Sequence, residues 1–343
     1  MLGYGYGGHT TYANKAVLVT GGLGFIGSNL AIRLVELGAR VTIIDSLVEG
    51  CGGTVDNVVD VLPSLKIRFA DLKDTESFAS ELDRPQVIFN LAGEVSHDRS
   101  MTAPMRDLQL NTVAQLSFLT TCAERYSGVR VVYASTRQVY GAPRHLPVTE
   151  DHPIDPVDFN GVNKFAACAY HQLLSRIGKI DAVVLRLTNV YGPRMALNVQ
   201  GKGFLHVYLR NALTTRPIEI YGDGKQLRDP VHVEDVVDAF LVAGAASGTS
   251  RVFNVAGPEA LQLQEIAEIA ARAGGCNIVR REFPESAKAI DIGSYRADAS
   301  RLARELNWRP RIHFRQGFAR TIEAYNATSF AKPIGMAAVL GAH

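Results

Sequence analysis

The sequence of 343 residues predicts an α/β protein: a Rossmann-type, doubly wound parallel sheet with a smaller C-terminal substrate lobe. Short β-branched apolar runs alternate with amphipathic stretches in the first half, as in βαβ units. A glycine-rich turn follows the first of these runs. The alternation changes after Tyr191-Gly-Pro193, where the lobe is expected to begin.

The expected elements follow in chain order. Six apolar runs are too short for helices and are predicted to be strands: Ala16–Thr20, Val41–Asp45, Ile67–Asp71, Val87–Ala92, Val129–Ser135 and Ala182–Thr188. Their nearly continuous apolar character indicates burial on both faces of a sheet. Helical patterns between the strands cover Phe25–Leu37, Leu108–Arg125 and Asn163–Arg176. The second half predicts a helix within Gly201–Gly224, a strand at Val252–Val255, and helices at Val233–Ala246, Leu263–Ala273 and near Gln316–Ala327.

Composition excludes several classes of protein. The sequence has 36 Lys and Arg against 34 Asp and Glu, so it supplies no global field for nucleic acid or an anionic membrane. No run reaches the roughly 18 apolar residues of a membrane span, and the start lacks a secretory signal pattern. The four cysteines lie far apart with no zinc-type spacing. We therefore expect reduced thiols, no metal and a cytoplasmic protein.

The glycine-rich turn has the dinucleotide fingerprint, which lets the backbone approach a pyrophosphate at a helix N-terminus. We expect the cofactor to contact Gly21, Gly24, Phe25, Ile26 and Gly27. The second expected strand ends at Asp45, whose carboxylate can accept hydrogen bonds from ribose hydroxyls and repels a 2′-phosphate. Neither Ser46 nor Leu47 supplies a cation for such a phosphate. The pattern favours NAD over NADP, with a purely structural turn as the alternative.

A set of further segments extends this pattern from about Lys15 to Ala327. The segments are Thr20–Gly27, Asp71-Leu72, Asn90–Gly93, Tyr133–Gly141, Leu185–Pro193, Ile220–Asp229 and Val233–Val236. Together they resemble the extended short-chain dehydrogenase/reductase family, specifically its nucleotide-sugar epimerases and dehydratases. The resemblance implies NAD as cofactor and a nucleoside-diphosphate sugar as substrate.

The resemblance also implies roles for individual residues. Asp71 and Leu72 would border the adenine, and Leu91, Ala92 and Ser135 would lie near the nicotinamide, with Lys164 on its ribose. Thr136 would touch the sugar. The implied substrate residues are Ser100, Arg137, Asn189, Gly203, Phe204, Tyr221 and Arg228.

Several of these residues also have a plain structural interpretation. Asp71 could cap a helix, Asn189 could shape a turn, and Arg228 could form a surface ion pair. Arg137 could bind a sugar carboxylate or pair with a carboxylate such as Asp158. The sequence leaves these alternatives open.

The helix that carries Lys164 departs from the family at the position of the catalytic base. Family members place a tyrosine four residues before this lysine, and its phenolate takes a proton from the sugar C4 hydroxyl. Here Asn160 holds that position, and an amide has no proton to exchange near neutral pH. Tyr221 and Lys225 have the same spacing, but the glycines between them indicate a chance match.

The identity of the proton acceptor therefore stays open. Candidates are His97, Glu94, neutral Lys164, or a water held by Asn160 and Thr136. Alternatively, the substrate assists its own oxidation, or the protein binds a nucleotide sugar without turnover.

The reaction type is narrowed by a second comparison within the family. Dehydratases carry Thr-Asp-Glu where this sequence has Thr136, Arg137 and Gln138, so the carboxyl groups that expel water are absent. By elimination we expect an epimerase that works through a transient 4-keto sugar, with Thr136, Lys164 and Asn160 as its catalytic residues. A lyase (5,6-dehydratase or decarboxylase) and a silent binding protein remain the alternatives.

The expected organisation has four parts. A loose tail covers 1–14, and an NAD-binding domain covers 15–188, to which 229–256 returns. A nucleotide-sugar lobe is formed by 189–228 and 257–330, and a second tail covers 331–343. In relatives, the helices expected at Leu108–Arg125 and Asn163–Arg176 also form a dimer seam, which predicts a homodimer.

Overall fold

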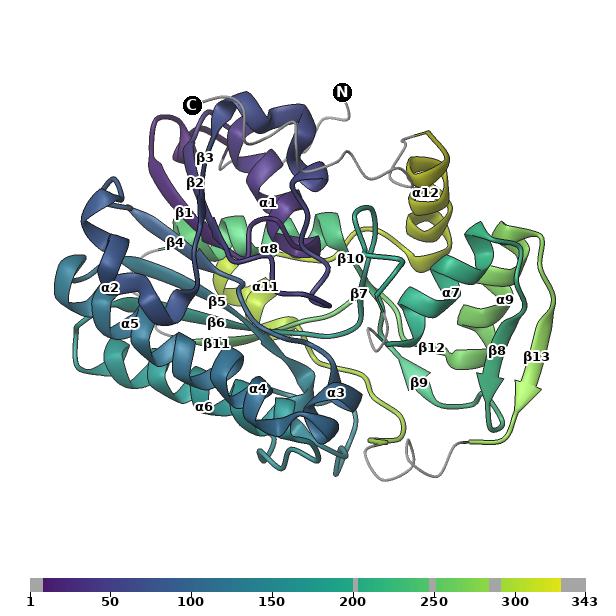
Figure 1. Ribbon diagram of the computed structural model, residues 1–343. Helices are drawn as coiled ribbons and strands as arrows, with labels where there is room; N and C mark the ends of the chain where they lie inside the picture. Colours follow the sequence, from purple (N-terminus) through teal and green to yellow (C-terminus); the bar gives the residue numbers. More distant parts are fainter. Residues whose placement is uncertain (1–8, 200–202, 247–250, 284–290, 328–343) are drawn as a thin grey trace.

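A seven-stranded parallel sheet, in the order β11-β6-β5-β4-β1-β2-β3, forms the centre of the protein (Figure 1). The computed structural model describes residues 9–199, 203–246, 251–283 and 291–327. The strands of this sheet are β1 (Ala16–Thr20), β2 (Arg40–Asp45), β3 (Leu65–Phe69), β4 (Val87–Asn90), β5 (Arg130–Thr136), β6 (Asp181–Leu187) and β11 (Val252–Val255). The predicted Rossmann-type α/β fold is confirmed.

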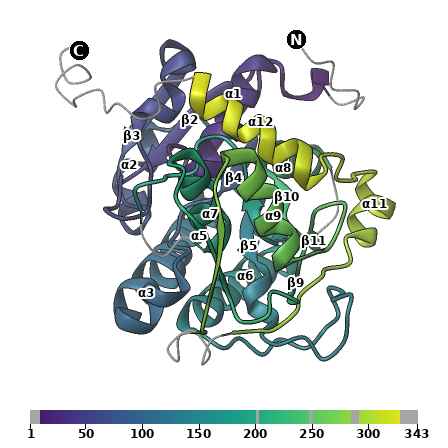
Figure 2. The same cartoon turned by 90° about the vertical axis from the view of Figure 1, so that its right-hand side faces the viewer.

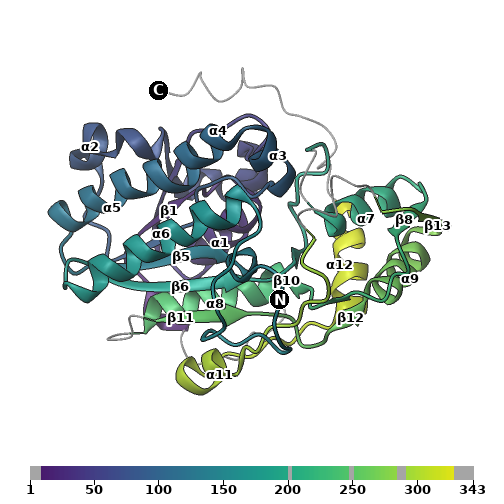
Figure 3. The same ribbon diagram turned by 90° about the horizontal axis from the view of Figure 1, so that it is seen from below.

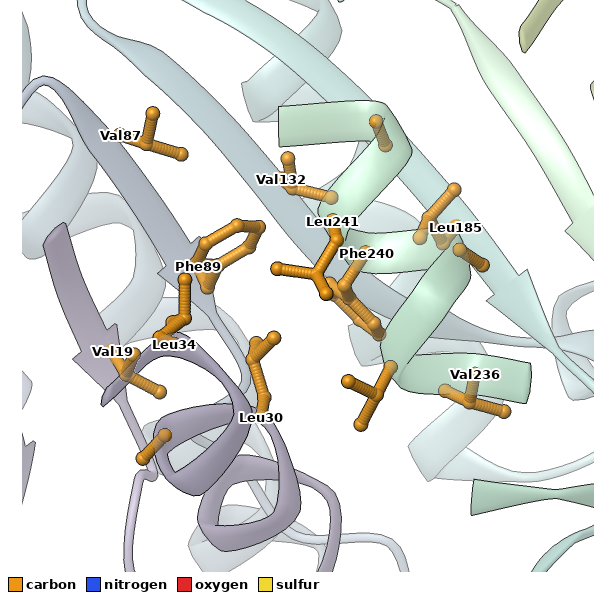
Figure 4. Packing of buried hydrophobic residues seen from close by; sticks show 14 of the residues in the cluster. Val19, Leu30, Leu34, Val87, Phe89, Val132, Leu185, Val236, Phe240 and Leu241 are labelled. Atoms are coloured by element: carbon orange, nitrogen blue, oxygen red, sulfur yellow. The ribbon is translucent and has the colours of Figure 1, made fainter. Parts of the chain in front are cut away.

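Helices cover both faces of the sheet (Figure 3). One face carries α1 (Phe25–Glu36) and α8 (Val233–Ala245), and the other carries α5 (Ala114–Arg125) and α6 (Phe159–Arg176). In Figure 4, Leu30 of α1 and Phe240 of α8 converge on Phe89 of β4. The rings of Phe89 and Phe240 meet edge to face with their centroids 6.2 Å apart. Apolar burial from both sides explains why these strands read as uninterrupted apolar runs.

The helix boundaries differ from the prediction where capping side chains act. The helix expected from Asn163 begins at Phe159, because the Asp158 carboxylate caps it by accepting a 2.6 Å hydrogen bond from the Gly161 amide. The expected helix Leu108–Arg125 consists of α4 (Pro104–Leu108), one π-helical turn (Gln109–Val113) and α5. The third strand ends at Phe69, so Asp71 lies in the loop beyond it.

A second group of elements packs beside the carboxyl ends of the strands, on the side that faces the viewer in Figure 2. Its helices are α7 (Phe204–Leu213), α9 (Leu263–Gly274) and α12 (Phe314–Ala327), which share one apolar core. The parallel pair β8 (Ile218–Tyr221) and β13 (Ile278–Arg281) was not anticipated from the sequence. The smaller elements are α2 (Thr75–Phe78), α3 (His97–Thr102), β7 (Val190–Tyr191), β9 (Leu227–Arg228), β10 (Val231–His232), β12 (Leu261–Gln262) and α11 (Ser300–Leu306).

Two segments return from this second group to the sheet. Strand β11 pairs with β6, and α8 packs against α1. The predicted N-terminal tail is shorter than expected, because the buried Tyr12 donates a 2.7 Å hydrogen bond to the Leu241 carbonyl. The predicted C-terminal tail, 331–343, lies outside the described residues. Within the described ranges, no helix has the length and apolar character needed to cross a membrane.

Candidate active site

A cavity of about 430 Å³ lies at the carboxyl ends of β1, β2, β4, β5 and β6. This is the edge where parallel sheets of this topology bind ligands, next to the point where the strand order reverses between β1 and β4. All the residues that the sequence assigned to cofactor, substrate or catalysis line this cavity, except Ser100 and Tyr221. The structure therefore brings together side chains from segments spread over most of the chain.

The turn between β1 and α1 forms a cradle at one end of the cavity. Gly24 is the N-cap of α1 and makes no side-chain cap bond, so the first amides of the helix face the cavity. A Cβ atom on Gly27 would lie 2.1 Å from the Gly21 carbonyl oxygen, so only glycine permits this approach of helix to turn. Such a helix N-terminus attracts the phosphates of a dinucleotide.

Asp45 ends β2 beside this cradle. Its carboxylate accepts hydrogen bonds from the backbone amides of Leu23, at 3.0 Å, and Leu47, at 2.9 Å. Burial raises the pKa of Asp45, and the two amide bonds oppose that rise. Asp71 caps the short helix after it by accepting a 3.0 Å hydrogen bond from the Lys73 amide, and it also lines the cavity.

These features fit the adenosine diphosphate half of NAD. The cradle offers amides to the pyrophosphate, and Asp45 offers a carboxylate to the ribose hydroxyls. Leu72 and Ala70 supply apolar wall for the adenine. Leu91 and Ala92 continue the wall toward the end of β5, where Ser135 and Thr136 lie.

Lys164 of α6 is buried at this inner end of the cavity. Burial lowers the pKa of Lys164 to about 8, although the nearby Asp107 carboxylate acts in the opposite direction. The ammonium lies 5.4 Å from the centre of the Tyr133 ring. Gly93 makes room for it, since a Cβ there would lie 2.8 Å from the lysine nitrogen.

Asn160 also lines the cavity, but its amide hydrogens are engaged by the protein. Its nitrogen donates to the Glu94 carbonyl at 3.0 Å and to the Asp107 carboxylate at 2.9 Å. Asn163 donates to the other oxygen of Asp107 at 2.8 Å. The Asn160 oxygen is thus the atom left to accept a hydrogen bond from a ligand.

His97 forms a pair with Asp158 that sequence reasoning did not identify. Its Nδ1 lies 2.9 Å from the Asp158 carboxylate, and the ring lines the cavity. Burial favours a higher pKa for Asp158, but hydrogen bonds from His97, Gly161 and Gln138 lower it below its ordinary value. The ionised carboxylate can only accept, so Nδ1 carries the hydrogen and Nε2 holds the free lone pair. Asp158 and Asn160 lie on one helix, but nothing in the local sequence indicates that Asp158 reaches His97.

The substrate side of the cavity contains two arginines. Arg228 donates to the carbonyls of Leu227, at 2.8 Å, and Gly293, at 2.6 Å, and lies 3.7 Å from the Asp291 carboxylate. Arg137 does not pair with Asp158, which was one of its predicted alternatives. Asn189, Gly203 and Phe204 complete this side.

Two predicted substrate residues lie elsewhere. The Ser100 hydroxyl is buried and donates to the His97 carbonyl at 2.7 Å, because it closes the first turn of α3. Tyr221 lies at the outer end of β8 with its ring against Phe283, which agrees with a chance match of its spacing to Lys225. Among the described residues there is also no group of three side chains suited to hold a metal ion.

Comparison with known proteins gives the family. A sequence model described as the NAD dependent epimerase/dehydratase family matches residues 17–256. The chain belongs to this family. Its members use NAD, in agreement with the cavity's cradle and Asp45.

Relatives within the family differ in their reactions. A UDP-glucose 4-epimerase of Mycolicibacterium smegmatis is 33% identical, with 91% of this chain and 99% of that protein covered. A dTDP-glucose 4,6-dehydratase of an Actinoplanes species is 30% identical, with 91% and 98% covered. The solved structure of MoeE5 with UDP-glucuronic acid and NAD is 29% identical, with a TM-score of 0.79 and 91% and 99% of the chains covered. Epimerases and lyases both match over about nine tenths of the chain, and the choice between them depends on the residues of this cavity.

Proposed function

We propose that this NAD-dependent family member is a nucleoside-diphosphate-sugar epimerase that works through a transient 4-keto sugar. The observation that carries the proposal is the set of residues after β5. Thr136 is followed by Arg137 and Gln138, so neither of these two positions holds a carboxyl group that could expel water. Oxidation and re-reduction are then the chemistry that remains.

The glycine turn after β1, Asp45 and Lys164 would hold NAD, which would supply reversible hydride transfer. The chain's own residues handle orientation and protons. Thr136 orients the reacting hydroxyl, and Lys164 holds the nicotinamide ribose and adds positive charge. Asn160 accepts a hydrogen bond from the sugar through its amide oxygen.

His97 is the proton acceptor in this proposal. Its Nε2 takes the hydroxyl proton as the carbon loses hydride, and it gives the proton back when the ketone is reduced. Asp158 fixes the tautomer and stabilises the imidazolium, as a buried carboxylate does for a catalytic histidine. The loop that carries His97 is tied to the Asn160 side chain through the Glu94 carbonyl, which supports a position close to the missing phenol.

The test is incubation of the NAD-loaded protein with UDP-, GDP-, CDP- and dTDP-sugars, read by mass spectrometry and proton NMR. We expect a product of unchanged mass with one inverted carbon and no accumulation of NADH. A product lighter by water or carbon dioxide would establish a lyase. Nucleotide-sugar binding without turnover would establish a silent binding protein.

We also propose a homodimer through the helical face formed by α4, α5 and α6. This face exposes large apolar side chains: Met105 (65% exposed), Leu116 (40%), Val162 (48%) and Leu173 (46%). Light scattering should give twice the chain mass, and Leu173→Glu should shift it to one chain. The four free cysteines fit a reducing compartment such as the cytoplasm.

A further inference from the structure

Arg137 is the one described arginine in the cavity whose guanidinium has a buried nitrogen with no partner. Its Nη1 is buried and donates a hydrogen bond to no acceptor among the described residues. The guanidinium lies over the Tyr295 ring, 4.8 Å from the ring centre. Burial lowers the pKa of Arg137, which shows that the protein does not fully compensate its charge. A desolvated cation with unused donors is costly unless a ligand supplies the acceptor.

The neighbouring carboxylates do not fill this role. Asp291 pairs with Arg228, and the Asp229 carboxylate accepts from the Ala297 amide at 2.7 Å. Burial raises the pKa of Asp229 to about 7, and its Oδ1 has no partner within the described residues. Asp158, the third carboxylate near Arg137, pairs with His97. None of these three carboxylates accepts a hydrogen bond from the buried Nη1 of Arg137.

The orientation of Arg137 is fixed before any ligand arrives. Tyr295 is fully buried, and its amide donates to the Leu227 carbonyl at 2.9 Å. Contact with this ring positions the guanidinium, whose edge is a fork of N–H donors, and the protein leaves the Nη1 donor unused. A planar carboxylate matches that fork.

We propose that Arg137 binds a carboxylate on the sugar, so that the substrate is a nucleoside-diphosphate hexuronic acid. This rests on the proposed function, because it places the sugar beside Thr136, the residue directly before Arg137. The diphosphate has other partners on the substrate side, Arg228 and the N-terminus of α7 at Gly203.

The test is a binding measurement, which does not depend on turnover. NAD-loaded protein is titrated calorimetrically with two matched pairs, UDP-glucuronate against UDP-glucose and GDP-mannuronate against GDP-mannose. The variants are Arg137→Gln, which removes the charge, and Arg137→Lys, which keeps the charge but not the fork. Arg301→Gln serves as control, since Arg301 pairs with Asp151 away from the cavity. Melting temperature and NAD retention verify folding of each variant.

We expect the unaltered protein to bind the uronate of at least one pair about tenfold or more tightly than its neutral partner. Arg137→Gln should weaken uronate binding about 10- to 100-fold and change neutral-sugar binding less than about twofold. Arg137→Lys should bind the uronate with an affinity between those of Arg137→Gln and the unaltered protein. Arg301→Gln should change the affinity for neither sugar.

Three outcomes would overturn the proposal: no preference for the uronate, binding of no member of either pair, or an equal loss for both sugars in Arg137→Gln. The last outcome would assign Arg137 to the diphosphate instead. Failure of the proposed function gives a different result, in which the uronate binds through Arg137 but is not epimerised.

Discussion

The two halves of the cavity are lined by different kinds of chemical group. The cofactor half comes from the first four strands of the chain and consists mainly of backbone amides and apolar walls, with Asp45 and Asp71 as its carboxylates. The substrate half combines His97, Lys164, Arg137 and Arg228, which come from four separate segments. One half presents mainly backbone and apolar surface to a ligand, and the other presents charged side chains, of which Lys164 and Arg228 are buried.

This difference explains how the family varies its chemistry. Backbone amides at a glycine turn cannot be exchanged by substitution, so the cofactor half tolerates little change. The substrate half depends on single side chains whose replacement leaves the fold intact. Asn160 and the pair of His97 with Asp158 are side chains of this second kind.

Replacing His97 by Asn should have the largest effect, and it sharpens the comparison because it changes only the substrate half. We expect kcat to fall about 10²- to 10⁴-fold, the range for loss of a general base, with NAD binding unchanged.

Two further variants control this experiment. Asp158→Asn should reduce kcat less than His97→Asn does, because the imidazole remains but its tautomer is no longer fixed. His313→Asn, in a residue 65% exposed beside Glu259, should have no effect. If His97→Asn turns over at the rate of the unaltered protein, another group accepts the hydroxyl proton, and the proposed role of the substrate half in catalysis is wrong.

Replacing Asn160 by Tyr has a smaller expected effect and tests whether this site has decayed or has been rebuilt. A phenol cannot reproduce the two hydrogen bonds that the amide donates, so the buried Asp107 carboxylate loses a donor. We expect turnover to fall about tenfold and the free energy of unfolding to drop by about 1–3 kcal/mol. A rate increase would show instead that a tyrosine at this position still serves as base.

The sequence predicted which residues gather at the cofactor end of the cavity, because the signals there are local. The glycine turn and Asp45 lie within one βαβ unit, where spacing alone determines geometry. It predicted less of the substrate half, because the contact between His97 and Asp158 joins a loop after β4 to the cap of α6. The stacking of Arg137 on Tyr295 joins even more distant segments. Such contacts depend on how whole elements pack, and no local pattern records them.

The smallest predicted effect concerns the free energy of unfolding, which the burial of Lys164 in the substrate half lowers. The folded protein lowers the pKa of Lys164 from 10.5 to about 8 through burial. Between these pH values the unfolded chain holds a proton that the folded protein has released, so the free energy of unfolding should rise with pH. Burial also raises the pKa of thiols such as Cys122, which lowers the free energy of unfolding over the same pH range, so the lysine is measured as a difference between variants. We expect the contribution of Lys164 to rise by about 1–3 kcal/mol between pH 8 and 10, measured by urea unfolding at a fixed NAD concentration.

Matched variants isolate the contribution of this lysine. Lys164→Met should abolish the rise and be more stable than the unaltered protein near pH 7, while its turnover and NAD retention fall. Lys225→Met should leave the rise unchanged, because Lys225 is 78% exposed. The buried thiols and tyrosines oppose this contribution in every variant alike, since burial raises the pKa of residues such as Tyr133 and the unfolded chain then loses its protons first. A rise that persists in Lys164→Met would mean that the charge of this lysine is compensated in the folded protein, and that catalytic charge in the substrate half carries no cost in stability.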